Sequence, residues 1–221
     1  TKGTETGNWI IQPEVQGTYI DIDTFMKTIG TVEFMEVSDF YVKPNVYASD
    51  KLDIYNKLED YSNWEVKYLN GKTIKSSSDY VTLNEDDTID LDYSFIESQI
   101  EGVAESFNLV GSTWGFRTSS DEFINVEGGT WGSVVDLEAE LNFLKDSFSS
   151  CESLEIREPI YSVSRGAIGE TYIEVSIDNQ HVWHYVDGNL CCESDCVTGR
   201  QGRNDTPHGV YYIIDMVDGK Y

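Results

Sequence analysis

The sequence predicts an α+β region over residues 1–150, followed from residue 169 by the first strands of an all-β domain. A helix is predicted from Asp92 to Phe107, because apolar residues recur there at helical spacing. A hairpin is predicted from Trp64 to Ile74, around an Asn-Gly pair that suits a tight type I′ turn. From Tyr172 to Ile177 the residue types alternate with a period of two, which is typical of a strand.

The rest of the N-terminal region also divides into short elements. Strands are predicted at residues 8–12, 18–22 and 31–41. Further helices are predicted after Asp23 or Thr24, over residues 52–61, and from Asp136 onward. A second hairpin is predicted to join residues 116–118 to residues 123–126, and the glycines at 128 and 129 end it. Residues 151–168 contain Pro159 and are expected to form a linker and a first extended segment.

The chain is strongly acidic. Forty acidic residues against fifteen basic ones give a formal charge of −25 over 221 residues. Nucleic acids and anionic membrane surfaces are therefore poor partners, since both attract basic proteins. The charge suits either a solvated surface or an attraction to cationic groups, such as the free amines of peptides. No apolar run reaches the roughly 20 residues that a membrane span needs.

Four cysteines, Cys151, Cys191, Cys192 and Cys196, raise the question of a metal site. They lack the paired C-x-x-C elements of a zinc site. Alternation along a strand would also point Cys191 and Cys192 to opposite faces. We therefore expect no metal and no cofactor. A disulfide from Cys196 or Cys151 and buried free thiols both remain open.

The three histidines, His181, His184 and His208, are candidates for a general base. Two of them lie on the predicted strand of residues 180–186, where they are expected to face solvent or a second layer. The third occupies a turn. None of the three is expected to be catalytic.

The C-terminal region contains an ordered set of motif residues. Gln180 is followed by aromatic residues at Trp183 and Tyr185 and by a turn at Gly188. Two turn motifs follow: the first is Val-Thr-Gly and ends at Gly199, and the second comprises Thr206, Pro207, His208 and Gly209. In this order and spacing the segment resembles the first half of an L,D-transpeptidase domain, the YkuD-like cysteine enzymes that cross-link bacterial peptidoglycan. We expect these positions to be structural, with glycines and proline in turns and the aromatic rings in packing.

Residues from about 9 to 150 resemble the α+β peptidoglycan-binding domain that often precedes Gram-positive L,D-transpeptidases. The resemblance depends on residues 12–17, 116–119 and 126–132. It implies an accessory domain at 1–150, comprising one or two subdomains, a linker at 151–168, and an incomplete catalytic domain at 169–221.

In that family the nucleophile is the cysteine of a Ser/Thr-His-Gly-Cys motif, and this sequence contains no such motif. The resemblance therefore implies an inactive fragment of an enzyme that forms 3→3 cross-links between peptidoglycan stems. It also implies a location in the cell envelope, with secretion or anchoring by an N-terminal segment, and stem peptides or glycan as partners. The alternatives are a non-catalytic wall-binding or scaffold module, and a thiol or metal protein built on Cys191, Cys192 and Cys196.

Overall fold

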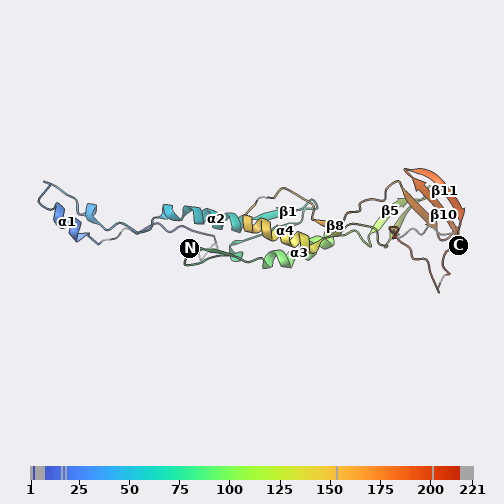
Figure 1. The fold of residues 1–221 in the computed structure, drawn as a ribbon, viewed down its shortest axis with the longest axis horizontal. Helices are drawn as coiled ribbons and strands as arrows, with labels where there is room; N and C mark the ends of the chain where they lie inside the picture. The colour runs from blue at the N-terminus through green and yellow to red at the C-terminus, as the bar shows by residue number, and fades with distance from the viewer. Residues whose placement is uncertain are drawn as a thin grey trace. The chain divides into compact units, whose positions relative to one another are not determined.

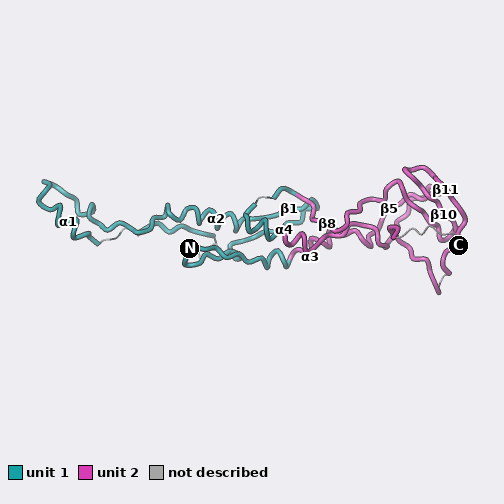
Figure 2. The backbone as a smooth tube through the Cα atoms, in the orientation of Figure 1, with its two compact units in different colours: residues 1–98, 144–156 teal, residues 99–143, 157–221 magenta. Residues whose placement is uncertain are grey.

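The computed structural model describes residues 2, 8–15, 17, 19–152, 154–200 and 202–214, and combines helices with small antiparallel sheets (Figure 1). This agrees with the predicted α+β class. Contacts divide the chain into unit 1, residues 1–98 and 144–156, and unit 2, residues 99–143 and 157–221 (Figure 2). Two of the three boundaries fall inside helices α3 (Ser94–Phe107) and α4 (Leu137–Ser150). The ranges 1–150, 151–168 and 169–221 follow a different division and stay a prediction.

Unit 1 combines helices with two short hairpins. Its α-helices are α1 (Ile22–Thr28) and α2 (Leu52–Asn63), and its short 3₁₀ helices are η1 (Val37–Phe40), η2 (Ala48–Lys51) and η3 (Ser78–Tyr80). Strands β1 (Glu65–Lys67) and β2 (Thr73–Lys75) form one antiparallel pair, and β3 (Val81–Leu83) and β4 (Ile89–Leu91) form another. Helix α2 confirms the helix predicted over residues 52–61.

An aromatic cluster forms the interior of unit 1. Phe148 is fully buried, and four aromatic rings surround it at centroid distances of 5.2 to 5.8 Å: Tyr61, Trp64, Tyr93 and Phe95. Three of these contacts are edge-on, the geometry that aromatic pairs prefer. The Trp64 indole N–H donates to the Ser147 hydroxyl at 3.3 Å, so its polar group is also satisfied.

The β1–β2 hairpin is confirmed, but its turn differs from the predicted type I′ turn. The loop comprises Leu69, Asn70 and Gly71, and of these only Gly71 has a positive φ, +84°. The Gly71 N–H donates to the Tyr68 carbonyl at 2.9 Å, and the Tyr68 N–H donates to the Lys72 carbonyl at 2.8 Å. A three-residue loop with glycine in the left-handed position also matches strand twist, and the Asn-Gly pair does not distinguish the two solutions.

The predicted strands at 8–12, 18–22 and 31–41 are wrong for the described residues. Trp9 makes a single isolated bridge, and Ile20 makes another with Tyr41; Thr18 lies outside the described residues. Asp21 begins α1 instead, because its carboxylate accepts from the Thr24 N–H and hydroxyl, which lowers its pKa. Residue-type alternation produces a strand only where a partner supplies a ladder of hydrogen bonds.

Unit 2 contains seven described strands, which form three antiparallel groups. Strands β5 (Thr113–Arg117) and β6 (Phe123–Glu127) confirm the second predicted hairpin. Strands β7 (Val134–Val135) and β8 (Tyr161–Val163) form a short pair. Strands β9 (Tyr172–Ser176), β10 (His181–Val186) and β11 (Asn189–Asp195) form a sheet with β10 in the centre. The first two strands of this sheet confirm the predictions at 172–177 and 180–186.

The two long helices begin shortly after predicted acidic residues, α3 two positions after Asp92 and α4 directly after Asp136. The Asp92 carboxylate accepts from the Ser94 N–H at 2.8 Å, and the Asp136 carboxylate accepts from the Ala139 N–H at 3.0 Å. Of the six apolar residues predicted for one face of α3, Phe107 is half-buried and the other five are buried: Phe95, Ile96, Ile100, Val103 and Ala104. The 3.6-residue periodicity therefore identified the buried face correctly.

A buried ion pair lies within unit 2. Glu140 of α4 is fully buried and receives two hydrogen bonds from the Arg157 guanidinium, at 2.5 and 3.1 Å. The Ile160 N–H donates to the same carboxylate at 2.8 Å. These donors offset the cost of burying the charge. The segment predicted as a linker therefore contributes both β8 and the partner of a buried carboxylate.

Candidate functional sites

Gln180 of the motif set connects the β9–β10 turn to the following segment. Its amide oxygen accepts from the Thr198 N–H at 2.9 Å, and its amide nitrogen donates to the Ile177 carbonyl and the Thr198 hydroxyl. Its own carbonyl accepts from the Cys196 N–H at 2.8 Å. Gln180 thereby fixes the segment that contains the Val-Thr-Gly turn motif.

The two turn motifs are joined to each other. The Gly199 N–H donates to the Thr206 hydroxyl at 2.8 Å. A Cβ at position 199 would lie 1.8 Å from the Asn204 carbonyl oxygen, so the backbone approach requires glycine. Gln180, Thr198, Gly199 and Thr206 thus belong to one hydrogen-bonded set.

Gly209 meets a second glycine motif. Gly129 and Val210 form a parallel bridge, in which the Val210 N–H donates to the Gly128 carbonyl and the Trp131 N–H to the Val210 carbonyl. A Cβ at position 129 would lie 2.1 Å from the Val210 oxygen, and a Cβ at position 209 would lie 2.7 Å from the Gly129 nitrogen. The sequence predicted each glycine motif separately and gave no sign that they pair.

Trp183 and Tyr185 lie on one face of β10 and are half-buried. The Tyr185 ring stacks on Tyr172 at 5.0 Å, and its hydroxyl hydrogen-bonds the Ser119 hydroxyl at 2.9 Å. The Trp183 ring lies 4.5 Å from the His181 ring. Both rings therefore pack against neighbouring side chains, and their structural role stays a prediction.

A polar network attaches the β5–β6 turn to the sheet. The Glu174 carboxylate accepts from the Ser119 N–H at 3.0 Å and from its hydroxyl at 2.6 Å, and that hydroxyl also contacts Tyr185. Burial raises the pKa of the neighbouring Tyr172, and nearby Tyr185 and Glu174 add to the effect. Ser119 and Glu174 are 55 positions apart, so no local sequence signal identifies them as partners.

Gly188 occupies the turn between β10 and β11. Asp187 and Gly188 both have positive φ, +49° and +76°, as a type I′ turn requires. The Gly188 N–H donates to the Glu170 carbonyl at 2.9 Å. This position is therefore a backbone turn between two paired strands.

The three histidines occupy different environments. The His181 ring contacts the carboxylates of Asp195 at 2.9 Å and Glu193 at 3.3 Å. The hydrogen bond to Asp195 raises the pKa of His181 most, and the hydrogen bond to Glu193 adds to the effect. His208 is exposed, and its backbone carbonyl accepts from the Tyr211 hydroxyl. His184 lies on the opposite face of β10 from His181, and its Nδ1 is 4.0 Å from the Cys192 Sγ.

The expected separation of Cys191 and Cys192 is wrong. His184 pairs with Cys192, whereas the next residue, Tyr185, pairs with Leu190. Cys191 is therefore the extra residue of a β-bulge, and alternation breaks there. As a result the ligand atoms of His184, Cys191 and Cys192 all lie within 4.8 Å of one another. All four cysteines are free thiols.

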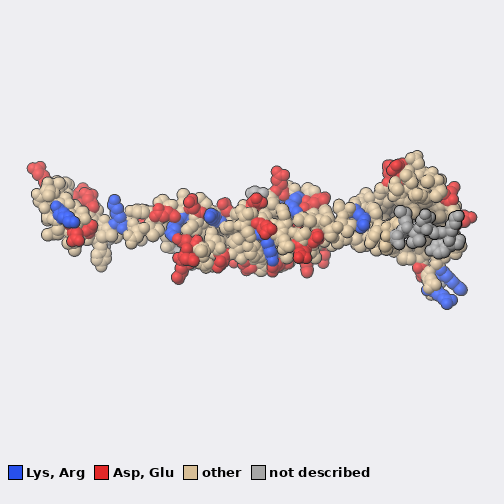
Figure 3. All heavy atoms as spheres, viewed as in Figure 1, with Lys and Arg blue, Asp and Glu red and all other residues tan. Residues whose placement is uncertain are grey.

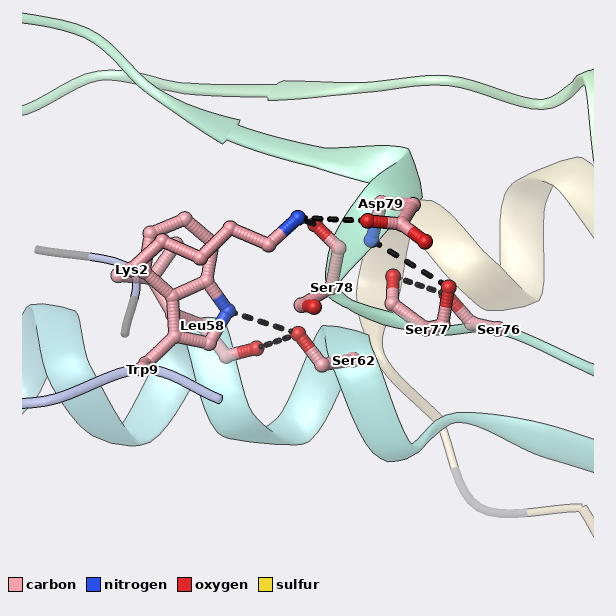
Figure 4. A network of polar contacts seen from close by, with 8 residues as sticks. All are labelled: Lys2, Trp9, Leu58, Ser62, Ser76, Ser77, Ser78 and Asp79. Carbon is pink, nitrogen blue, oxygen red and sulfur yellow. Dashed lines mark hydrogen bonds and ion pairs between the residues drawn. The ribbon is translucent and has the colours of Figure 1, made fainter. Parts of the chain in front are cut away.

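Unit 1 contains a pocket of about 240 Å³ beside its N-terminal segment. Trp9 forms part of the wall, and its indole N–H donates to the Ser62 hydroxyl at 2.8 Å, which in turn donates to the Leu58 carbonyl at 2.6 Å (Figure 4). In the same view Lys2 donates to Asp79 and to the Ser78 carbonyl. The wall also includes Tyr47, Tyr55, Lys51 and Asp87, the last two joined as an ion pair.

The acidic residues are scattered over the face seen in Figure 3, which shows fewer basic side chains. This agrees with the dispersed acidity of the sequence. Among the described residues, no helix combines the length and apolar character that crossing a bilayer demands.

No family model matches the chain, and no curated protein matches it. Among solved structures, the carbamoyl enzyme of Ldtfm with avibactam is 25% identical over 73% of this chain, with a TM-score of 0.49. A mutant of Enterococcus faecium L,D-transpeptidase is also 25% identical, over 72% of this chain, with the same TM-score. The chain spans 65% and 66% of the lengths of these two structures. Both are L,D-transpeptidases, the family that the sequence motifs resemble.

Proposed function

We propose that this chain is part of a peptidoglycan L,D-transpeptidase and supplies its accessory region and the first strands of its catalytic domain. The observation that carries the proposal is the connected motif set. The Gln180 side chain accepts from the Thr198 N–H, and the Gly199 N–H donates to the Thr206 hydroxyl. Residues selected by their order in the sequence therefore form one hydrogen-bonded structure.

In this proposal the nucleophile lies outside the chain. Its cysteine thiolate would attack the carbonyl between the third and fourth residues of a peptidoglycan stem, and D-Ala would leave. A side-chain amine of a second stem would then capture the acyl-enzyme and form a 3→3 cross-link. The residues present here position the sheet, and the chain by itself is expected to be inactive.

The exposure of the β9–β11 sheet supports this proposal. Every residue of the three strands, all within the described range 154–200, is half-buried or exposed. Ile173, Val175 and Leu190 are 50%, 46% and 48% exposed. Further strands of a catalytic domain would cover apolar area of this kind, since a sheet normally buries one face.

A cell-envelope location follows from the same proposal. The substrate, peptidoglycan stems, lies outside the membrane, so the protein would be secreted or anchored by a further segment. The acidic surface suits stems with free amines, and nucleic acid is not proposed as a partner.

The test compares this chain with the full product of its gene. Both are incubated with disaccharide-tetrapeptides, and dimers and released D-Ala are measured by mass spectrometry. We expect dimers and a carbapenem adduct only with the full product, the adduct on a cysteine of a Ser/Thr-His-Gly-Cys motif. A gene that encodes no such motif, or a full product that forms neither dimer nor adduct, would overturn the proposal.

A second candidate function is wall binding by unit 1. The observation that favours it is the pocket, in which the aromatic Tyr47 and Tyr55 lie beside the Lys51–Asp87 ion pair. Aromatic rings with a few polar groups are the usual lining of a ligand site.

The test is retention of the chain on purified peptidoglycan sacculi. Tyr55→Ala is expected to reduce retention, whereas Tyr19→Ala, which removes a tyrosine that is 83% exposed and does not line the pocket, is the matched control. Equal retention of the two variants would exclude the pocket as the binding site, and a chain that is not retained at all would exclude this function.

A further inference from the structure

The β10–β11 hairpin places three metal-binding side chains together. The ligand atoms of His184, Cys191 and Cys192 lie within 4.8 Å of one another. His184 is half-buried, and both cysteines are exposed, so an ion from solvent has direct access. The proximity results from the bulge, because a regular strand would turn one of the two adjacent cysteines away.

We propose that His184, Cys191 and Cys192 bind a thiophilic metal ion, with Zn²⁺ as the representative ion. One imidazole and two thiolates form a Cys₂His set, which leaves the fourth tetrahedral position to water or to a ligand. The inference does not depend on the proposed transpeptidase.

The geometry is close to what the ion needs. Tetrahedral zinc with its usual bond lengths separates its ligand atoms by roughly 3.5 to 3.8 Å. The Cys192 Sγ and the His184 Nδ1 are already 4.0 Å apart. Rotation of the exposed cysteine side chains is enough for the remaining contraction. Each thiol that becomes a ligand releases its proton, so binding of Zn²⁺ releases up to two protons.

The neighbouring carboxylates belong to the other face of the hairpin. Glu193 and Asp195 contact His181 there, at 3.3 and 2.9 Å. The three ligands therefore form a soft nitrogen and sulfur set, which selects zinc or copper(I) over magnesium or calcium. The overall charge of −25 also raises the concentration of cations near the surface.

The experiment uses the full chain, reduced with a phosphine and freed of metal. It is titrated with Zn²⁺ in competition with a chromophoric chelator, and with Co²⁺ to detect a thiolate-to-cobalt charge-transfer band. We expect one ion per chain and a sulfur-dependent band. Cys191→Ser, Cys192→Ser and His184→Ala should each weaken binding by at least about tenfold.

Cys196→Ser and Cys151→Ser are the matched controls and should bind as the unchanged chain does. Circular dichroism confirms that each variant is folded. No binding by the reduced chain, no loss in His184→Ala, or an equal loss in Cys196→Ser would overturn the proposal. Zn²⁺ binding that survives without the charge-transfer band would overturn it as well, since the thiolates would then not be ligands.

Discussion

The interior of unit 1 and the β9–β11 sheet of unit 2 differ in how completely their apolar side chains are buried. Phe148 is fully buried within a cluster of four aromatic rings. In the sheet, Ile173 and Val175 are about half exposed. Both regions have regular secondary structure with strong sequence signals. Local patterns therefore specify the elements, whereas burial depends on what other segments cover them.

The largest expected effect distinguishes these two regions directly. Phe148→Ala should lower the free energy of unfolding by about 3–5 kcal/mol, because it empties the centre of the aromatic cluster. Ile173→Ala should cost well under half of that, because half of the side chain already contacts water. Urea denaturation followed by near-ultraviolet circular dichroism measures both. Equal losses would show that the sheet is covered in solution and would break the comparison.

Substitutions in the buried Glu140–Arg157 ion pair test whether the stability of unit 2 depends on polar contacts. Arg157→Met should destabilise the protein by about 3 kcal/mol, the lower end for broken buried pairs, since a fifth of the arginine side chain is exposed. The double variant Glu140→Leu, Arg157→Met should recover most of this loss, because it leaves no buried charge. Thermal unfolding of the three proteins provides the measurement. A double variant no better than Arg157→Met would refute this account.

A smaller effect is expected at the motif set. Gln180→Ala removes three side-chain hydrogen bonds and should cost about 1–2 kcal/mol. Hydrogen exchange should show faster exchange at the Thr198 amide, with unchanged exchange in α2. Gln12→Ala, at an exposed glutamine, is the control. Uniformly faster exchange across the chain would argue that Gln180 acts on global stability.

The smallest effect concerns the pH response of the sheet. Asp195 and Glu193 raise the pKa of His181 in the folded protein. Protonated His181 therefore stabilises the sheet at pH values below the unfolded histidine pKa, and this contribution is lost as the pH rises through the folded pKa. Asp195→Asn should lower the pKa of His181 in an NMR titration, and Asp178→Asn should not. An unchanged pKa in Asp195→Asn would exclude that contact in solution.

The sequence predicted helices better than isolated strands. Helices α2, α3 and α4 follow from apolar spacing, and α3 and α4 also follow from acidic residues at their start; both are local signals. The strands predicted at 8–12 and 31–41 failed because a strand needs a partner, and alternation does not supply one. The N-terminal segment folded instead around the local cap at Asp21.

The candidate sites also include some contacts that the sequence suggested and others that it did not. The spacing of Gln180, Gly199 and Thr206 suggested a structural set, and their side chains and amides are connected. The contact of Ser119 with Glu174 lay beyond prediction, because it joins distant segments. The bulge at Cys191 was also missed, since the register shift depends on how β10 and β11 pair. An alternation pattern does not indicate that a strand contains one extra residue.

The approach of Gly129 to Gly209 and Val210 has a consequence for the order of folding. The parallel bridge joins Gly129 to Val210, positions about 80 residues apart, so it closes a long loop that contains several hairpins. Closing such a loop costs entropy that a single bridge recovers poorly, so the hairpins would form before it does. Contacts that form after the folding transition state affect the unfolding rate more than the folding rate. Substitution of these glycines would thus raise the unfolding rate and leave the folding rate nearly unchanged.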